Sequence, residues 1–292
     1  MVVLGSSTIL VGPEQLDALR RSLLQGKDAA LLKPTNRYED FRIRCGGGLA
    51  IGFKTGKIVV NSEGCRAAVV KAIAEIGGEE SGHDITIGSD EAGKGEWLGP
   101  MVVAAVALTP SQSMTLRGLG VMDSKALKLA KIAQLAVEIA ADSTSASTVL
   151  ISPKKFNEKF AEIHKEGKNL NDLLAWAHAK VISEVYQHIQ PDKHGLRVRV
   201  VIDEFSKLKT ERRLNRVLEL KSIELIQRPR AEDDIAVASA SILARNSREV
   251  WIDKESDRLG VDLRALKAAE ALSRADCSSF AKLSYLKRPA DV

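Results

Sequence analysis

The sequence has few cysteines, no long apolar run and no internal repeat. Its 292 residues include three cysteines, Cys45, Cys65 and Cys277, whose spacing fits no metal-ligand motif. We therefore expect reduced thiols in a cytoplasmic protein. No apolar run approaches the roughly 18 residues that a membrane-spanning helix needs, and the first residues lack the basic start and apolar centre of a signal peptide. These absences argue against a zinc-cluster, disulfide-stapled or membrane protein.

The length and composition are those of a globular protein. A chain of 292 residues is long enough to bury a core and to form two domains. Its content of 45% apolar and 28% charged residues is ordinary. The formal net charge of +5 mildly favours a polyanionic partner.

A polar, glycine-containing segment, residues 77–84, is the best linker candidate. Before it, residues 1–76 are predicted to form a small α+β domain. Apolar periodicity and turn residues indicate helices over 13–24 and 65–76 and strands over 41–44, 49–53 and 58–60.

After the linker, strands and helices alternate through residues 85–292, with a helical C-terminal segment. The predicted strands are 85–88, 101–108, 148–151, 198–202 and 223–226. The predicted helices are 127–141, 153–160, 173–189 and 235–251. Because two strands come first and alternation follows, we expect an α/β fold with a mixed sheet flanked by helices.

Two adjacent carboxylates, Asp90 and Glu91, stand between an apolar run and a glycine-rich turn. Side by side they repel each other, and a divalent cation is the best candidate to neutralise them because hard cations prefer carboxylate oxygen. Neighbouring residues of a strand point to opposite faces. We therefore expect the strand to end at Gly88, so that the bend allowed by Gly93 and Gly95 brings both carboxylates to one rim.

Further acids follow along the chain. Asp203 ends the apolar run 198–203, the position from which α/β enzymes commonly present functional groups. The cluster Glu232-Asp233-Asp234 stands just before the helix predicted over 235–251. Acids there also cap a helix and complement its dipole, which we favour for Asp233 and Asp234. For Glu232 the functional and capping interpretations are evenly balanced.

The order of these carboxylates resembles that of the type 2 ribonucleases H. The segment Asp90-Glu91, the turn Gly93-Lys94-Gly95 and the step Gly99-Pro100 are similar to the first motif of that family. Residues 123–127, Asp-Ser-Lys-Ala-Leu, resemble its DSKxL motif, and Arg230-Ala231-Glu232 resembles its Lys-Ala-acid step. The resemblance covers roughly residues 85–287.

Within the family, the chain is most similar to ribonuclease HIII. That branch carries an N-terminal domain resembling half of the TATA-binding protein, which fits the elements predicted over residues 1–76. Asn169 and Asn171 with His178, and the segment 280–283, are also similar to that branch. The family usually places its fourth acid one residue further from the Ser-Ile-Leu-Ala segment than Glu232 lies. The fourth carboxylate is therefore Glu232 or Asp233.

The resemblance implies a metal-dependent endonuclease. It would hydrolyse the RNA strand of RNA/DNA hybrids and leave 3′-hydroxyl and 5′-phosphate ends. Two Mg²⁺ ions, with Mn²⁺ as a substitute, are the expected cofactors. Asp90 would bridge both ions, Glu91 and Asp203 would each complete one coordination shell, and Glu232 (or Asp233) would hold the water-side metal or the water.

The expected partner is an RNA/DNA hybrid duplex, read through its shape and 2′-hydroxyl groups. Gly93 and Gly95 would let the backbone approach the ribose, and Lys94 would meet a phosphate. Further phosphate contacts are predicted for Ser124 and Lys125, and for Lys54 and Lys57 beside a hairpin of the N-terminal domain. A solvated surface charge is the competing interpretation for each lysine. His178, among apolar residues, is predicted to be structural. We expect a monomer that needs no membrane and no obligate protein partner.

Three alternatives stay open. The nearest is ribonuclease HII-like incision at single ribonucleotides embedded in DNA. The segment Asp90-Glu91-Ala92-Gly93 is more similar to the corresponding motif of that branch. The tyrosine motif of ribonuclease HII is, however, not found near the C-terminus. A phosphate-binding loop over 88–94 is disfavoured relative to either activity, since Gly95 replaces the Ser/Thr that would hold Mg²⁺. A non-catalytic hybrid-binding module would lack one of the carboxylates.

Overall fold

The computed structural model describes residues 7–76, 82–122, 124, 127–190, 193, 195–203, 207–217, 223–229 and 231–286. The chain folds into two compact units, one formed by residues 1–85 with 108–121 and the other by residues 86–107 with 122–292. Most of the predicted linker, residues 77–81, lies outside the described residues.

The first unit contains, within the described residues, a five-stranded antiparallel sheet in the order β1-β5-β4-β3-β2. Its strands are β1 (Ser7–Leu10), β2 (Ala30–Leu32), β3 (Glu39–Cys45), β4 (Gly48–Phe53) and β5 (Lys57–Val60). Its helices are η1 (Pro13–Gln15), α1 (Leu16–Leu24), α2 (Glu63–Ile76) and α3 (Pro110–Gly118). Strict alternation along β3 buries Phe41 and Ile43 against Leu19, Leu23 and their neighbours.

The elements predicted for residues 13–76 are confirmed as α1, α2, β3, β4 and β5. The edge strands β1 and β2, of four and three residues, were not predicted, because so short a strand shows too few alternations by itself. The equally short β5 was identified by the hairpin turn over 55–57 that precedes it. The likeness of this unit to half of the TATA-binding protein stays a prediction.

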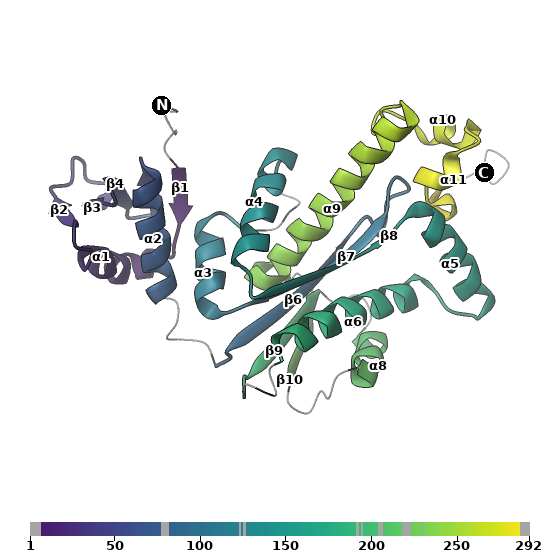
Figure 1. The fold of residues 1–292 in the computed structure, drawn as a ribbon, viewed down its shortest axis with the longest axis horizontal. Helices are drawn as coiled ribbons and strands as arrows, with labels where there is room; N and C mark the ends of the chain where they lie inside the picture. The colour runs from purple at the N-terminus through teal and green to yellow at the C-terminus, as the bar shows by residue number, and fades with distance from the viewer. Residues whose placement is uncertain are drawn as a thin grey trace. The chain divides into compact units, whose positions relative to one another are not determined.

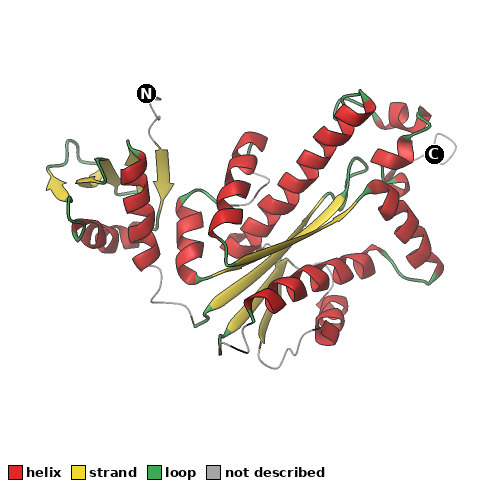
Figure 2. Ribbon diagram, in the orientation of Figure 1, coloured by secondary structure: helices red, strands yellow, loops and turns green. Residues whose placement is uncertain are grey.

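The second unit is built on a sheet in the order β10-β9-β6-β7-β8 (Figures 1 and 2). Its strands are β6 (Ile85–Ala92), β7 (Met101–Leu108), β8 (Ser145–Ile151), β9 (Val198–Asp203) and β10 (Ile223–Arg228). Since β9 and β10 are parallel whereas β7 and β8 are antiparallel, the predicted mixed sheet is confirmed.

Helices cover both faces of this sheet. Figure 1 shows α4 (Leu129–Asp142) and α9 (Ile235–Leu259) on one side, with α6 (Leu170–Ile189) and α8 (Lys207–Val217) on the other. The remaining described helical elements are α5 (Pro153–Lys165), η4 (Ala231–Asp233), α10 (Ala268–Ser273), α11 (Cys277–Phe280) and η5 (Leu283–Tyr285). Because it is covered on both faces, β7 is buried along its whole length. No helix in the described part of the chain combines the length and apolar character needed to cross a bilayer.

Close contact between β6 and α9 depends on small residues. The start of α9 is rich in buried Ala and Ser, so the helix axis can approach the strand. Gly88 completes this contact, because a Cβ atom there would lie 2.1 Å from backbone atoms of Ala236 and Val237. Gly88 is therefore part of a strand packed under a helix, which also removes the proposed phosphate-binding loop over 88–94.

Substituting Gly88→Ala should lower the free energy of unfolding of the second unit by about 1–3 kcal/mol, because either strand or helix backbone must shift to admit the methyl group. Urea denaturation followed by circular dichroism measures this change. Gly95→Ala is the matched control, since a Cβ at Gly95 meets nothing within 4 Å. Equal stability of the two variants would contradict the role assigned to Gly88.

Candidate active site

Asp90 and Glu91 lie inside β6, which continues to Ala92. The predicted strand end at Gly88 is therefore wrong. Alternation along the strand sends the two carboxylates to opposite faces: Asp90 accepts a hydrogen bond from Ser241 of α9, whereas Glu91 meets His178 of α6. Both still line one cleft, because the strand ends directly after them.

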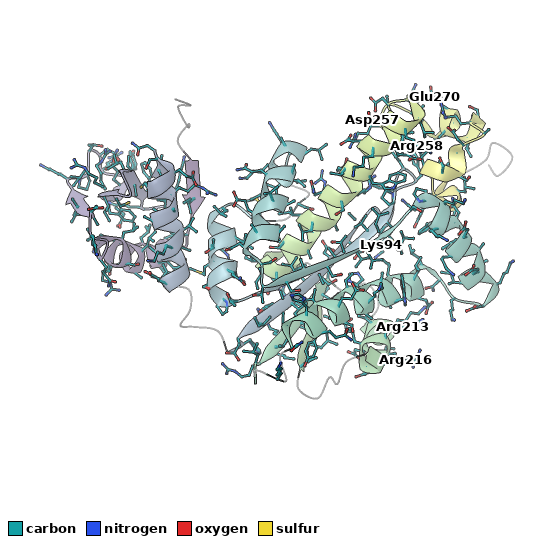
Figure 3. All side chains as sticks on the ribbon, in the orientation of Figure 1. Lys94, Arg213, Arg216, Asp257, Arg258 and Glu270 are labelled. Carbon is teal, nitrogen blue, oxygen red and sulfur yellow. The ribbon has the colours of Figure 1, made fainter. Side chains whose placement is uncertain are left out.

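This cleft has a volume of about 650 Å³. The predicted site residues on its wall are Asp90, Glu91, Gly93, Lys94, Ser124 and Asp203. Lys94, labelled in Figure 3, projects from the loop that follows β6. The wall also contains residues that no motif in the sequence singled out: Ser241, Arg245, Arg248, Glu249 and Arg264. Arg245 donates to the Ser124 carbonyl oxygen, and the Ser124 hydroxyl lies 2.8 Å from the Ser241 hydroxyl.

Other predicted residues lie elsewhere. Lys54 and Lys57 belong to the first unit, where both side chains are exposed at the turn between β4 and β5. Gly95 lies in the loop after β6. Lys125 lies outside the described residues, as does the Glu232 side chain.

The neighbouring carboxylates have opposite electrostatic surroundings. Burial and the negative charge of Glu91 raise the pKa of Asp90 to about 7. Burial also raises the pKa of Glu91, but the hydrogen bond and charge of His178 and the charge of Lys94 lower it to about 2. Two carboxyl groups whose surroundings separate their pKa values are typical of functional sites.

The contacts of Glu91 explain its low pKa. Lys94 Nζ lies 3.2 Å from Glu91 Oε1, and His178 Nε2 lies 3.1 Å from Glu91 Oε2. His178 is fully buried and its Nδ1 lies 2.8 Å from Ser89 Oγ. No sequence pattern identified this contact, because His178 is 87 residues from Glu91 and the position of α6 decides the pairing.

The remaining acids divide into two groups. Asp203 ends β9 as predicted, lines the cleft and accepts a hydrogen bond from the Ala231 amide at 3.3 Å. Asp234 is the N-cap of α9 and accepts from the Ala236 amide at 2.9 Å, so its predicted capping role is confirmed. Asp233 forms an exposed ion pair with Arg228 instead of capping the helix.

The loop after β6 is held by the segment that follows α11. Gly93 has a φ of 79°, and a Cβ there would lie 2.3 Å from the Pro100 carbonyl oxygen, so glycine is required. The Tyr285 hydroxyl donates to the Lys94 carbonyl oxygen at 2.6 Å, and Lys282 Nζ donates to the Gly99 carbonyl oxygen at 2.5 Å. These bonds fix the backbone of the loop that carries Lys94.

The donor set fits a hard divalent cation. Asp90, Glu91 and Asp203 offer only carboxylate oxygens, and the raised pKa of Asp90 marks negative charge that its protein partners do not neutralise. Within the described residues no group of three His, Cys, Asp or Glu side chains converges as ligands of one ion. One reason is the orientation of Glu91, whose two carboxylate oxygens contact Lys94 and His178.

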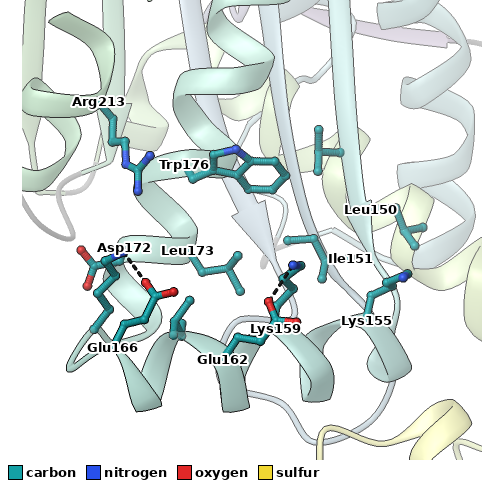
Figure 4. A pocket seen from close by; sticks show the side chains of 13 residues that line it. Leu150, Ile151, Lys155, Lys159, Glu162, Glu166, Asp172, Leu173, Trp176 and Arg213 are labelled. Carbon is teal, nitrogen blue, oxygen red and sulfur yellow. Dashed lines mark hydrogen bonds and ion pairs between the residues drawn. The ribbon is translucent and has the colours of Figure 1, made fainter. Parts of the chain in front are cut away.

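A second pocket, of about 500 Å³, lies between β8, α5, α6 and α8 (Figure 4). Its centre is apolar and includes Leu173 and Trp176. Charged groups on its rim are paired with one another, Lys159 with Glu162 and Lys168 with Glu166. None of the carboxylates predicted for catalysis lines it, so the carboxylate cleft is the better candidate for the active site.

Comparisons with known proteins agree on one family. A family model described as Ribonuclease HII matches residues 87–274. Ribonuclease HIII of Protochlamydia amoebophila is 41% identical over 181 residues, covering 61% of this chain and 55% of that protein. Ribonuclease HIII of Chlamydia caviae is 31% identical over 268 residues, covering 88% of this chain and 85% of the relative.

Solved structures show the same fold. The crystal structure of Bst-RNase HIII in complex with Mn²⁺ has a TM-score of 0.60 and 22% identity, covering 96% of each chain. That of Aquifex aeolicus RNase H3 has a TM-score of 0.52 and 18% identity, covering 96% of this chain and 100% of the other.

The raised pKa of Asp90 predicts a pH-dependent stability in the presence of a chelator. The folded protein keeps this proton up to about pH 7, whereas an unfolded aspartate releases it near pH 3.9. The folded state therefore binds more protons in this interval, and the free energy of unfolding should fall as pH rises from about 5 to 7, by up to a few kcal/mol. Urea denaturation across this range measures the change.

Asp90→Asn is the control for that measurement. Asn carries no charge, so the variant should lack this part of the pH dependence and should be more stable than the unsubstituted protein at pH 8. Glu91, whose pKa is about 2, acts only at lower pH. Parallel pH profiles for the two proteins would refute the assignment.

Proposed function

The chain belongs to the type 2 ribonuclease H family and is most similar to ribonuclease HIII, and we propose that it cleaves RNA/DNA hybrids at the carboxylate cleft. The reaction is endonucleolytic hydrolysis of the RNA strand, leaving 3′-hydroxyl and 5′-phosphate ends. The observation that carries the proposal is that Asp90 and Glu91, from the end of β6, line the same cleft as Asp203, from the end of β9.

Asp90, Glu91 and Asp203 would hold the divalent cations, with Glu232 as the fourth carboxylate. We propose two Mg²⁺ ions with substrate bound, and Mn²⁺ as a substitute; a solved structure of Bst-RNase HIII contains Mn²⁺. Such ions neutralise the phosphate, lower the pKa of the attacking water and stabilise the leaving oxygen. The preference for Glu232 over Asp233 is supported by the exposed ion pair that Asp233 forms with Arg228.

The loop Gly93-Lys94-Gly95 would meet the substrate. Gly95 has open space at its Cα, which suits close approach of a ribose. Lys94 would exchange its contact with Glu91 for one with a phosphate, because its side chain is about one-third exposed and such ion pairs are weak. Ser124 and Lys125 would add further phosphate contacts, and Lys54 and Lys57 would grip the duplex from the first unit.

The alternative is ribonuclease HII-like incision at a single ribonucleotide embedded in DNA. The match of residues 87–274 to the Ribonuclease HII family model favours this second activity. The alignment with Chlamydia caviae ribonuclease HIII, which spans most of both chains, supports continuous hybrids as the main substrate. We further propose that the protein acts in the cytoplasm as a monomer.

Cleavage of two labelled duplexes with Mg²⁺ tests the proposal: a continuous RNA/DNA hybrid and a DNA duplex with one ribonucleotide. We expect cutting of the hybrid, with loss of about a thousand-fold or more in rate for Asp90→Asn, equivalent to roughly 4 kcal/mol of transition-state stabilisation. Efficient cutting of the single-ribonucleotide duplex instead would establish the alternative. Cutting of neither with Mg²⁺ or Mn²⁺, or full activity in the variant, would refute the nuclease assignment at this cleft.

Replacing both Lys54 and Lys57 with alanine should raise KM for the hybrid and leave kcat unchanged. Each lysine that meets a phosphate releases counterions, so the slope of log affinity against log salt should fall by about one per lysine. Titration of the hybrid at several salt concentrations measures the slope. Lys71→Ala, an exposed lysine on α2 of the same unit, is the control. An unchanged slope in the double variant would exclude both lysines from the interface.

A further inference from the structure

Three buried or partly buried side chains, Ser89, His178 and Glu91, form a hydrogen-bonded chain that ends at the cleft. Ser89 and Glu91 are two residues apart on β6, so both face α6. Between them stands His178, in the middle of α6 and fully buried, as is Ser89. Nδ1 of His178 lies 2.8 Å from Ser89 Oγ, and Nε2 lies 3.1 Å from Glu91 Oε2. One imidazole thus connects the strand core to a carboxylate of the cleft.

The hydrogen-bond directions follow from the groups present. Ser89 Oγ donates to the Ala104 carbonyl oxygen at 2.8 Å, and a hydroxyl has one hydrogen. Towards His178 the Ser89 oxygen therefore accepts, so Nδ1 carries a proton. On the other side of the ring the carboxylate oxygen Glu91 Oε2 can only accept, so Nε2 donates to it. Ser89 sets the ring orientation, and the ring sets the direction of the carboxylate.

The two side chains that contact Glu91, Lys94 and His178, differ in how firmly they are held. Lys94 reaches Oε1 from a loop, with its side chain 35% exposed, so this contact is screened and replaceable. His178 reaches Oε2 from a buried position with 0% side-chain exposure. A ligand entering the cleft can displace Lys94 from Oε1, whereas His178 keeps hold of Oε2.

We propose that His178 is a positioning residue for the cation site, holding Oε2 of Glu91 so that Oε1 is presented to the cleft. The role rests on the proposed function. A carboxylate fixed through one oxygen loses less side-chain freedom when the other binds a cation, which strengthens binding. Groups that orient a ligand in this way typically contribute 10–100-fold to metal affinity.

A pair of amide substitutions separates the two ring nitrogens. The side chain of His178→Gln reaches about as far as Nε2 and still donates to Glu91, whereas that of His178→Asn reaches only as far as Nδ1 and keeps the Ser89 side. Asn is one methylene shorter than Gln and leaves more space unfilled at this buried position, so a purely structural role would appear as a difference in urea stability between the variants. Mn²⁺ alone is the probe, titrated calorimetrically into full-length protein, with urea stability of the chelated protein measured in parallel.

We expect His178→Asn to weaken Mn²⁺ binding 10–100-fold and His178→Gln to stay within about threefold of the unsubstituted protein. At saturating Mn²⁺, hybrid cleavage by His178→Asn should recover most of its kcat. Equal Mn²⁺ affinity in both variants, whether unchanged or equally weakened, would overturn the positioning role. If His178→Asn does not fold, Ser89→Ala tests the same chain from its other end, and unchanged Mn²⁺ affinity there would likewise overturn the role.

The unsubstituted protein distinguishes the two levels of failure. If it cleaves the hybrid and binds Mn²⁺ while the amide variants do not differ, only the positioning role fails. If it neither cleaves the hybrid nor binds Mn²⁺, the proposed function fails and the role of His178 fails with it.

Discussion

Asp90 and Glu91 are neighbours in the sequence, and their mutual repulsion is the constraint on which the arrangement of the second unit depends. A strand resolves part of the conflict by pointing the two side chains to opposite faces. Each face then supplies a different partner, Ser241 from α9 for Asp90 and His178 from α6 for Glu91. Two of the helices that cover the sheet, α9 and α6, therefore also supply the side chains that set the charge state of the site. The outcome is a carboxyl group with a pKa of about 7 beside one with a pKa of about 2.

This arrangement requires α9 to lie very close to β6. The hydroxyl of Ser241 reaches Asp90 only because the preceding turns of α9 are small and Gly88 leaves room for the helix backbone. The same approach places Arg245 one turn further along, at the wall of the cleft. Packing and chemistry therefore depend on the same strand. Gly88, which leaves room for α9, lies two positions before Asp90, which accepts a hydrogen bond from that helix.

Sequence reasoning identified every strand of the second unit that the structure describes and three strands of the first, the carboxylate that ends β9 and the helix that begins after Asp234. It erred at Gly88, where glycine suggested a strand end although its role is to admit α9. The role of His178 was not predictable, because a histidine among apolar residues has the same local pattern whether or not it meets a carboxylate. Only the position of α6 over the odd-numbered residues of β6 distinguishes the two cases.

The loop that follows β6 is held in place by residues far away in the sequence. A loop that presents glycines to a substrate is entropically costly to order unless other bonds hold it. Here the backbone of Trp97, Leu98 and Gly99 pairs with residues 280–282, and the Tyr285 hydroxyl secures the Lys94 carbonyl. Lys282 is buried to reach Gly99, at the cost of a pKa lowered to about 7 by burial and by the charge of Arg248. The energetic cost of burying Lys282 is tolerated because its hydrogen bond fixes the backbone of the loop after β6. This loop carries the glycines that would meet the ribose.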